Sequence, residues 1–542
     1  MPIKDDLLRR GYLPENLPPT FTTDALGIYL AQKRTWYSQP RGAVRAATYN
    51  ASKRGMTRRV FSLVHPETAH DLAEFVSNRE GELTRFFQQS QFSLSVPRVT
   101  PDGDRAVEIA THSELESARL ARLAPYRFVA RTDISRFYHS VYTHSVPWAF
   151  HGKAASKADR RANSGNLFMN RLDLILRAGQ DGQTIGIPVG PDASRYIAEV
   201  ICTAIDQEFV ARGGGDGCAI LRHVDDVWIG ANTHAEAEAA LYKYREAIRA
   251  FELDINETKT HIYSENFHYS DSWPTDVAAR IEFALASAPR RISERLRAAL
   301  EHAFALTVAG SDDGILKYTL RYLDKSNLPA AQWEVVEPFL KRAAVHYGHT
   351  IDFVARIIVW RHLTKRDLDI EAWGNILVAL LDRHGRLGND GEVCWALYAS
   401  LRLGVPIPLS AALEISKNCG AISIVPLLSA AQIGLVDQAI FGETENLIIA
   451  EDASGPYWPL FLEWRVRDWP EGIFLLPRNA LIEELIGQNI SIFDDTRLPS
   501  VFRDLDENEF GEVEHAIEAR SGYDDEGDDD DEDEEDEIEV DF

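Results

Sequence analysis

The sequence predicts an α+β protein in which a mixed helix-and-strand half precedes an all-helical half and an acidic tail. Three observations support this order. Two apolar runs with strand-like composition, 126–133 and 219–230, each carry aspartate. Between about 276 and 500, amphipathic helical stretches, the first of them expected over 276–309, follow one another with short Gly, Pro, Asn or Asp breaks and no strand alternation. From Asp524 to Asp541 the chain holds 15 acidic residues and no basic ones.

The composition is that of a large intracellular protein with more than one domain. A chain of 542 residues exceeds a comfortable single core. Its four cysteines have no pairing or metal-binding spacing, so we expect buried free thiols in a reducing cytoplasm. They are Cys202, Cys218, Cys394 and Cys419. No apolar signal core and no run of eighteen apolar residues occurs, so neither secretion nor membrane insertion is expected.

Residues 1–60 are expected to form an N-terminal basic arm that opens with an extended proline-rich segment, 11–19. Residues 33–59 carry eight basic residues and no acidic ones, with Trp36, Tyr37 and Tyr49 interleaved. Basic side chains with aromatic ones suit phosphate contact and base stacking. A merely solvated basic face is the alternative interpretation.

Asp225 and Asp226 lie in the middle of the second strand-like run, with apolar residues on both sides and Gly230 after them. This pattern predicts a tight β-hairpin whose turn carries the aspartate pair. Because burying two like charges is costly without a neutralising cation, the pair predicts a divalent metal. An ordinary turn or helix cap is the alternative for an isolated Asp-Asp.

A third aspartate, Asp133, ends the first strand-like run. Between it and the Asp-Asp pair lies a Gly/Pro-rich loop, 183–191, that opens a helix expected from about 194 to 210. Glycines let the backbone approach a nucleotide closely. Nucleotidyl transfer is a reaction that needs such a carboxylate set, because it uses two Mg²⁺ ions roughly 3.5–4 Å apart. The three aspartates and the loop therefore predict a two-metal polymerase site.

This order of motifs resembles the reverse-transcriptase palm, with its first aspartate motif, its glycine-proline loop and its Asp-Asp hairpin. His223 stands where many members carry Tyr or Phe. The run from Asp133 to Tyr138, with the segments 142–148 and 151–157, is similar to the bacterial abortive-infection reverse transcriptases, which are anti-phage proteins within the defence-associated group. The motif resemblance covers roughly the first half of the chain.

The resemblance implies a domain layout. Residues 61–272 would form the reverse-transcriptase fingers and palm, with fingers helices over 66–91 and a palm helix over 236–252. Residues 273–515 would form an α-helical, HEAT-like repeat domain in place of a thumb. Residues 516–542 would form a disordered acidic tail, which either keeps the protein soluble or mimics nucleic acid. Without the 15 acidic residues of the tail, the formal net charge of −27 becomes −12.

The resemblance also assigns roles within the site. Asp133 and Asp225 would hold two Mg²⁺ ions, with Mn²⁺ as an alternative, and Asp226 would be a peripheral ligand. The backbone carbonyl of Ile134 would add one more. Tyr138 would lie under the sugar of the incoming nucleotide and exclude a 2′-hydroxyl, so that dNTP is the substrate. Core packing is the alternative role for Tyr138. Further nucleotide-pocket residues would be Gln183, Gly186, Pro188, Gly190 and Lys259.

The implied activity is RNA-directed or untemplated DNA synthesis in an anti-phage abortive-infection system. A non-coding RNA template, a closed homo-oligomer and a location in the bacterial cytoplasm are implied with it. The family starts DNA on its own tyrosine, which leaves the product covalently attached. The candidates here are Tyr49 first, then Tyr37 and Tyr523. Two other functional classes stay open: an RNA-dependent RNA polymerase with the same palm, and a non-catalytic scaffold that acts through the helical domain.

Overall fold

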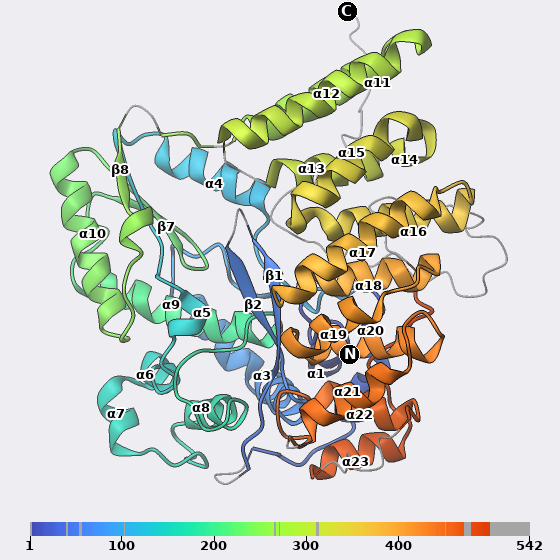
Figure 1. The fold of residues 1–542 in the computed structure, drawn as a ribbon. Helices are drawn as coiled ribbons and strands as arrows, with labels where there is room; N and C mark the ends of the chain where they lie inside the picture. The colour runs from blue at the N-terminus through green and yellow to red at the C-terminus, as the bar shows by residue number, and fades with distance from the viewer. Residues whose placement is uncertain are drawn as a thin grey trace, which may run out of the picture.

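The computed structural model describes residues 3–38, 42–53, 57–101, 103–264, 267–269, 271–310, 314–449, 451–470 and 478–498. Helices and strands are mixed up to β8 (His261–Tyr263), and every later element in the described residues is a helix (Figure 1). The expected order of a mixed half and a helical half is therefore confirmed. The expected acidic tail, 516–542, lies outside the described residues.

A four-stranded antiparallel sheet lies at the centre of the mixed half. Its strand order is β6 (Ala219–His223), β7 (Asp226–Ala231), β5 (Phe128–Thr132) and β8, so that β5 is an inner strand. Side chains alternate between the two faces, as strand geometry requires. One face packs on α4 (His112–Leu123) and the other on α10 (His234–Arg249). Both predicted strand runs thus lie side by side in one sheet.

Local sequence signals explain the helices next to this sheet. Thr111 and Thr233 each accept a hydrogen bond from the backbone N–H three residues on, and Glu114 and Glu236 complete both capping boxes. The helix expected over 194–210 is α9 (Ala193–Ala211), and the palm helix expected over 236–252 is α10. The first fingers helix is α3 (Pro66–Phe87), which starts with proline at its first position.

The N-terminal residues are packed into the body of the protein. They form α1 (Ile3–Arg9), α2 (Asp24–Ala31) and the antiparallel hairpin of β1 (Ala47–Ser52) with β2 (Arg58–Leu63). Several basic side chains of this segment are engaged in ion pairs with other parts of the chain. Lys33 lies 2.6 Å from Glu484, and Arg58 lies 2.7 Å from Glu392. These cations are therefore committed to intramolecular partners.

The remaining elements of the mixed half are short. They are β3 (Arg98–Val99), β4 (Val107–Glu108), α5 (Phe137–Ser140), α6 (Ser145–His151), α7 (Lys153–Ala158), α8 (Met169–Ala178) and the 3₁₀ helix η1 (Glu257–Lys259). Helices α6, α7 and α8 gather at the lower left of Figure 1, away from the helical half.

The helical half consists, in the described residues, of α11 to α23 with one 3₁₀ turn. Their bounds are α11 (Trp273–Leu285), α12 (Pro289–Gly310), α13 (Gly314–Lys325), α14 (Leu328–Ala331), α15 (Trp333–His346), η2 (Gly348–Thr350), α16 (Ile351–Lys365), α17 (Ile370–Arg386), α18 (Asp390–Leu403), α19 (Leu409–Asn418), α20 (Ala421–Gln432), α21 (Ala439–Ile448), α22 (Trp458–Val466) and α23 (Ala480–Gly487). One predicted boundary is wrong, because the stretch expected over 276–309 is two helices. The second of them begins at Pro289, whose ring is tolerated in a first turn but not in a helix interior.

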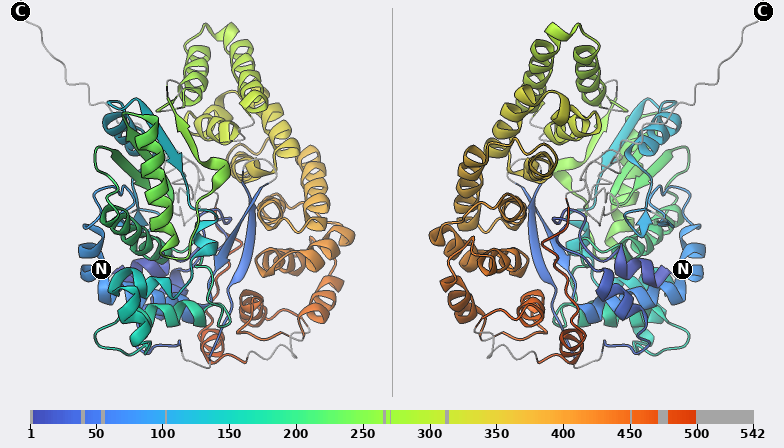
Figure 2. Two further views of the ribbon diagram at one scale, coloured as in Figure 1. Left: turned by 90° about the vertical axis from the view of Figure 1, so that its left-hand side faces the viewer. Right: turned by 90° about the vertical axis from the view of Figure 1, so that its right-hand side faces the viewer.

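The packing of these helices has a regular pattern. Helices α15, α17, α19 and α21 contact one another in succession, and α16, α18, α20 and α22 do the same. The helices therefore form two parallel rows, which curve around the mixed half as an arch (Figure 2). Helices α11 and α12 pair with each other at one end of the arch.

The two halves meet along the β1–β2 hairpin, which lies between the sheet and the helical arch (Figure 2). Strand β1 packs on α18 and α20. At its base, the indole N–H of Trp458 donates to the Leu63 carbonyl, and the fully buried His65 lies 3.0 Å from the Ala453 carbonyl. Among the described residues, no helix is long and apolar enough to cross a membrane.

Candidate functional site

Asp133 directly follows β5, the inner strand of the sheet. The residue is 4% exposed. One carboxylate oxygen, Oδ2, forms an ion pair with the ammonium of Lys259. The other, Oδ1, is buried and has no hydrogen-bond partner. A buried carboxylate oxygen without a donor is costly, so this atom is an acceptor that a cation from outside the chain could satisfy.

Lys259 reaches Asp133 because η1 interrupts the strand pairing beside β5. Arg131 pairs with His261, and continuing that register would pair Ile134 with residue 258. Ile134 instead bridges to Ile255, so three extra residues are accommodated in η1. A bulge of this kind redirects a side chain. Here it places Lys259 over the first aspartate.

Asp225 and Asp226 lie at the turn of the β6–β7 hairpin, as the sequence predicted. The last residue pair of the hairpin is His223 with Asp226, which leaves Val224 and Asp225 as the turn. Thr132 pairs with Val227, so Asp133, the next residue along the chain, lies opposite Asp226. The sheet therefore brings the first aspartate motif beside the second.

The hairpin turn is strained. Val224 has φ of +51°, a conformation that β-branched residues strongly avoid and that costs roughly 1–3 kcal/mol. Two hydrogen bonds hold it. Its N–H donates to Ser95 Oγ at 2.5 Å, and its carbonyl accepts from Arg222 Nη1 at 3.2 Å. The turn is thus fixed through both of its peptide groups.

Arg222 is the centre of a buried ion network under this turn, which sequence reasoning missed. Its guanidinium is fully buried, donates to both carboxylate oxygens of Glu199, and donates through Nε to Asp206 at 2.9 Å. Glu199 and Asp206 are seven residues apart, on one face of α9. A usable signal was present, because two acidic residues on a largely apolar helix face need a buried cation. Burial raises the pKa of Asp206 to about 6.

The three aspartates interact electrostatically. Burial is the largest of the causes that raise the pKa of Asp225 to about 7; the charges of Asp226 and Asp133 act in the same direction, and Lys259 opposes them. Asp226 Oδ1 lies 3.3 Å from Arg131, which is two residues before Asp133 on β5. The site therefore holds more negative charge than its own cations neutralise.

Within the described residues, no group of three or more His, Cys, Asp or Glu side chains is already arranged as a metal-binding cluster. Instead, the Asp133 carboxylate pairs with Lys259, and the Asp226 carboxylate pairs with Arg131. The donor set nevertheless fits a hard divalent cation, because it consists of carboxylate oxygens and one of them, Asp133 Oδ1, has no partner.

The backbone of Ile134, directly after Asp133, is oriented by its pairing with Ile255. Ser135 N–H donates to the Asp254 carbonyl and Asn256 N–H donates to the Asp133 carbonyl. Ile134 and Ile255 are thus a non-hydrogen-bonded pair, so the peptide groups of Ile134 point away from Ile255. They point to the side on which β7 and the aspartate turn lie.

Tyr138 lies close to the aspartates, at the start of α5. Burial raises the pKa of its phenol, and Arg195, Asp225 and Arg59 act on it electrostatically. Its backbone carbonyl accepts a hydrogen bond from Ile187 N–H at 2.8 Å. The glycine-proline loop is therefore attached to the segment that carries Tyr138.

Within this loop, Gly186 and Gly190 have φ of +94° and +120°, which favour glycine. A side chain at Gly190 would also meet the ring of Pro14 at 3.0 Å, so the N-terminal segment closes the loop from behind. Gln183 is exposed, and Pro188 is half-buried between the two glycines. Ser62 of β2 donates its N–H to the Val189 carbonyl, which ties the loop to the β1–β2 hairpin.

The tyrosines named as initiation candidates are placed differently. Tyr49 is fully buried in β1, its hydroxyl donates to the Asn16 carbonyl at 3.3 Å, and burial raises its pKa well above the usual value. This is the geometry of a packing residue in the described conformation. Tyr37 is half-buried, and burial raises its pKa to about 12. Tyr523 lies outside the described residues.

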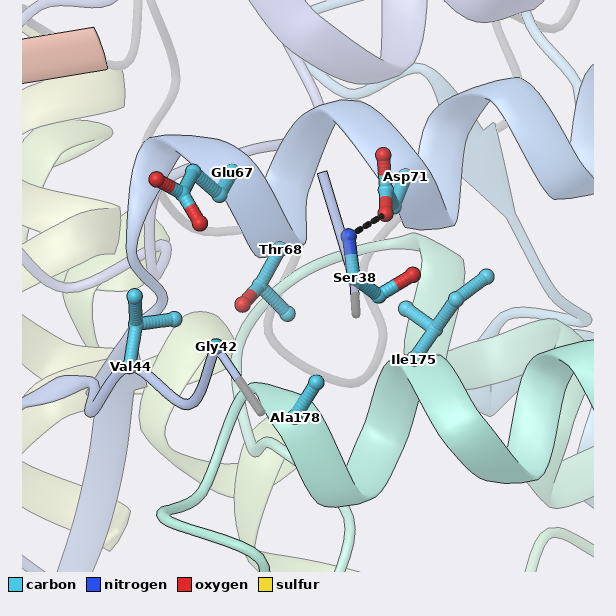
Figure 3. A pocket seen from close by; sticks show the side chains of 8 residues that line it. All are labelled: Ser38, Gly42, Val44, Glu67, Thr68, Asp71, Ile175 and Ala178. Carbon is cyan, nitrogen blue, oxygen red and sulfur yellow. Dashed lines mark hydrogen bonds between the residues drawn. The ribbon is translucent and has the colours of Figure 1, made fainter. Parts of the chain in front are cut away.

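A small cavity lies elsewhere, between α3 and α8 (Figure 3). Its volume is about 10 Å³, which is room for one water molecule at most. Asp71 on its wall accepts a hydrogen bond from Ser38 N–H at 2.6 Å. The cavity includes none of the predicted site residues.

Comparison with known proteins gives one family match. Residues 58–270 match the family described as "Reverse transcriptase (RNA-dependent DNA polymerase)". No curated protein matches the chain.

Three solved structures give weak overall similarity. A Candida tropicalis apo telomerase truncated from its C-terminal domain is 13% identical with a TM-score of 0.28, over 45% of this chain and 54% of that one. The Candida tropicalis apo telomerase is 10% identical with a TM-score of 0.31, over 79% and 71%. The Candida albicans telomerase, in complex with a fragment of telomeric RNA, is 10% identical with a TM-score of 0.26, over 64% and 66%. The chain thus spans about half the length of the first of these.

Proposed function

Because residues 58–270 form a reverse-transcriptase domain, a nucleotidyltransferase, we propose that this chain is a DNA polymerase that uses dNTP and divalent metal. The observation that carries the proposal is the meeting of Asp133 with the strained turn of Asp225 and Asp226, where one buried carboxylate oxygen has no partner. In the reaction, the 3′-hydroxyl oxygen of the growing strand forms a bond to the α-phosphorus. The bond from that phosphorus to the bridging oxygen breaks, and pyrophosphate leaves.

The chain's own residues hold and orient the reactants. Asp133 and Asp225 would hold two Mg²⁺ ions, or Mn²⁺ as the alternative, with Asp226 as a peripheral ligand and the Ile134 carbonyl as a further oxygen donor. When bound, the ions lower the pKa of the attacking hydroxyl and stabilise charge on the leaving group. The raised pKa of Asp225 supports this role, because a divalent cation would offset both causes of the rise, first the burial of the carboxylate and then its repulsion by Asp226 and Asp133.

Selection of the nucleotide is assigned to Tyr138 and the loop attached to it. A bulky ring under the sugar excludes a 2′-hydroxyl, which favours dNTP. Gly186, Pro188 and Gly190 shape the pocket, and Gln183 lies at its exposed edge. Lys259, which forms an ion pair with Asp133, is proposed to exchange that carboxylate for the triphosphate.

The test is incorporation of labelled dNTP by the protein with Asp225→Ala and Asp226→Ala. We expect activity to be lost while the protein stays folded. A matched control removes two exposed carboxylates of the helical half, Glu334→Ala with Glu443→Ala, and should keep full activity. Full incorporation by the Asp225 and Asp226 variant would overturn the polymerase assignment.

The same assay separates the two other functional classes. An RNA-dependent RNA polymerase would incorporate NTP and not dNTP, which Tyr138 argues against. A non-catalytic scaffold would incorporate neither and would keep its biological effect in the Asp225 and Asp226 variant. The presence of all three aspartates argues against the scaffold.

The biological setting proposed is an anti-phage abortive-infection system in the bacterial cytoplasm. It rests on the similarity of 133–138, 142–148 and 151–157 to that branch of reverse transcriptases. The two rows of helices support a HEAT-like repeat domain in place of a thumb. A closed homo-oligomer and a non-coding RNA template belong to the same proposal. Loss of phage protection in the Asp225 and Asp226 variant is expected, and light scattering at micromolar concentration tests the oligomer.

Synthesis is further proposed to start on a tyrosine, so that DNA stays covalently attached. Tyr37 is the better-placed candidate among the described residues, because the burial of Tyr49 opposes both access and deprotonation. Each Tyr→Phe variant keeps the ring and removes only the nucleophile. Purified Tyr37→Phe, Tyr49→Phe and Tyr523→Phe proteins should therefore be compared for DNA that partitions into phenol and is released by protease. If all three variants still carry attached DNA, none of these tyrosines is the residue on which synthesis starts.

A further inference from the structure

We infer that a surface on α6 and α7 binds the single strand of nucleic acid that leads to the nucleotide loop. This surface, called here the Trp148 surface, consists of Tyr142, Trp148, Lys153, Lys157, Arg160 and Arg161. It has no role in the site described above. The inference rests on the proposed polymerase function, since it names the path of the strand that the site would copy or release.

The charge of the surface is opposite to that of the chain. Residues 151–161 hold four basic residues and one acidic residue, in a chain with a formal net charge of −27. All four cations are exposed. Two of them have acidic neighbours, because Lys153 lies 2.9 Å from Glu252 and Arg161 lies 2.9 Å from Asp159. Lys157 and Arg160 form no ion pair within the described residues, which leaves their charge available to a phosphate.

Two of the cations lie beside an aromatic ring, Trp148, that stays partly exposed. The ammonium of Lys153 lies 4.4 Å from the centre of the Trp148 ring, and that of Lys157 lies 5.3 Å from it. The Tyr142 ring packs edge-on against Trp148, with centroids 5.5 Å apart. Single-stranded nucleic acid is bound by this combination of stacking rings and phosphate-contacting cations. A duplex offers no free base faces to the rings, so the surface favours a single strand.

The surface continues into the nucleotide loop. Tyr142 bridges to Ile185, and Thr143 N–H donates to the Thr184 carbonyl at 2.8 Å. Ile185 is 64% exposed beside Gly186, so the loop presents an apolar side chain next to the rings. In Figure 1, α6 and α7 lie on the opposite side of the molecule from the helical arch. The Trp148 surface is therefore an approach to the site that is separate from that arch.

The test measures strand binding without catalysis. Fluorescence anisotropy of a labelled 15-nucleotide single strand, as RNA and as DNA, is recorded in EDTA without dNTP over a series of salt concentrations. A 15-base-pair duplex is the comparison. The variant is Lys153→Gln with Lys157→Gln, and the matched control is Lys365→Gln with Lys417→Gln, two exposed lysines of the helical half.

We expect the Lys153 and Lys157 variant to bind the single strand about tenfold more weakly at low salt. The slope of log affinity against log salt should fall by about 1.4, because each lost phosphate contact on a single strand contributes about 0.7. The control should match the unmodified protein. Trp148→Ala should weaken binding by a similar factor and leave the salt slope unchanged, because stacking is not ionic.

The RNA and DNA arms identify the strand. Tighter RNA binding through this surface marks the template side, and tighter DNA binding marks the product side. An unchanged affinity and slope in the Lys153 and Lys157 variant would overturn the inference, as would equal loss in the control. The assay measures binding and no synthesis. Its result therefore does not depend on whether the protein proves to be a polymerase.

Discussion

Two buried aspartates, one in each half of the molecule, have opposite surroundings. Asp390 begins α18 and is 4% exposed, the same as Asp133. Both of its oxygens are satisfied: Oδ1 accepts from Gly420 N–H and Ser423 Oγ, and Oδ2 accepts from the Asn50 side chain at 2.7 Å. Asp133 has one oxygen paired with Lys259 and one with no partner.

The difference separates a carboxylate that holds the fold together from one that is kept ready for a ligand. Neutral donors around Asp390 compensate its burial and tie β1 to the helical arch. The surroundings of Asp133 leave part of that cost uncompensated, and the neighbouring turn adds backbone strain at Val224. Strain and unsatisfied polar atoms of this kind gather at functional sites.

The largest expected effect comes from Asp133→Asn. The amide keeps the shape of the carboxylate but removes its charge, so cation binding and dNTP incorporation should fall about a thousandfold or more. The midpoint of thermal unfolding should stay within a few degrees, because the replaced group was poorly satisfied. Steady-state incorporation and differential scanning fluorimetry measure the two effects. Retained activity, or a large loss of stability, would place Asp133 with Asp390 as a structural group.

Arg222→Met should be the most destabilising single change near the site. It leaves Glu199 and Asp206 buried without a cation, which costs roughly 3–5 kcal/mol. It also removes the donor to the Val224 carbonyl. Denaturant unfolding measures the loss of stability. Incorporation of dNTP per folded molecule measures how much activity is lost when the turn lacks its donor.

A compensated variant separates these two roles of Arg222. With Glu199→Gln and Asp206→Asn added to Arg222→Met, the buried charges are gone and much of the stability should return. Activity should stay low, because the turn still lacks its donor. Recovery of activity along with stability would show that Arg222 only neutralises charge.

The sequence predicted the parts of the site that have local signatures. Asp133, Asp225 and Asp226 were found from strand-like runs that end or turn at carboxylates, and the sheet does bring those runs together. The helices were predictable from capping and periodicity, except that Pro289 divides one expected helix into two.

The missed features depend on contacts between distant residues. Arg222 is bound by residues 16 and 23 positions earlier, and the turn of Val224 is held by Ser95, 129 positions away. Tyr49 looked like an accessible tyrosine in a basic segment, yet the structure packs it beneath the helical arch. Local composition does not contain the pairings that decide burial, so these placements could not be read from the sequence.

Asp390→Asn should lower the stability of the protein without changing its activity, because Asp390 is the fully hydrogen-bonded aspartate of the comparison. Its amide nitrogen cannot accept the hydrogen bonds that one carboxylate oxygen now receives, which should lower stability by about 1–3 kcal/mol. Incorporation per folded molecule should not change. Asp382→Asn on α17 is the control, because Asp382 pairs with Arg386 at the surface and should matter by about 0–1 kcal/mol. A selective loss of activity in Asp390→Asn would show that the interface around β1 also shapes the site.

A pH dependence of stability is also expected at the same interface, from His65. Burial of the ring, which packs edge-on against Trp458, lowers its pKa to about 3, and the hydrogen bond with the Ala453 carbonyl only partly opposes this shift. The ring accepts from Glu67 N–H through Nδ1, so Nε2 carries the proton that the Ala453 carbonyl accepts. In the unfolded chain the imidazole has a pKa near 6.5 and takes up a proton as the pH falls.

Between about pH 6.5 and pH 3 the unfolded state therefore binds more protons at this residue than the folded state does. Stability should fall with decreasing pH across that window, by up to about 1.4 kcal/mol per pH unit from His65 alone. His65→Gln keeps a hydrogen-bonding side chain that does not titrate, so its stability should fall less steeply than that of the unmodified protein. His346→Gln is the control, because His346 is the exposed last residue of α15. It should leave the dependence of stability on pH unchanged. Parallel stability curves for the unmodified and His65→Gln proteins between pH 6.5 and pH 5 would show that the ring is not held neutral where the two halves meet.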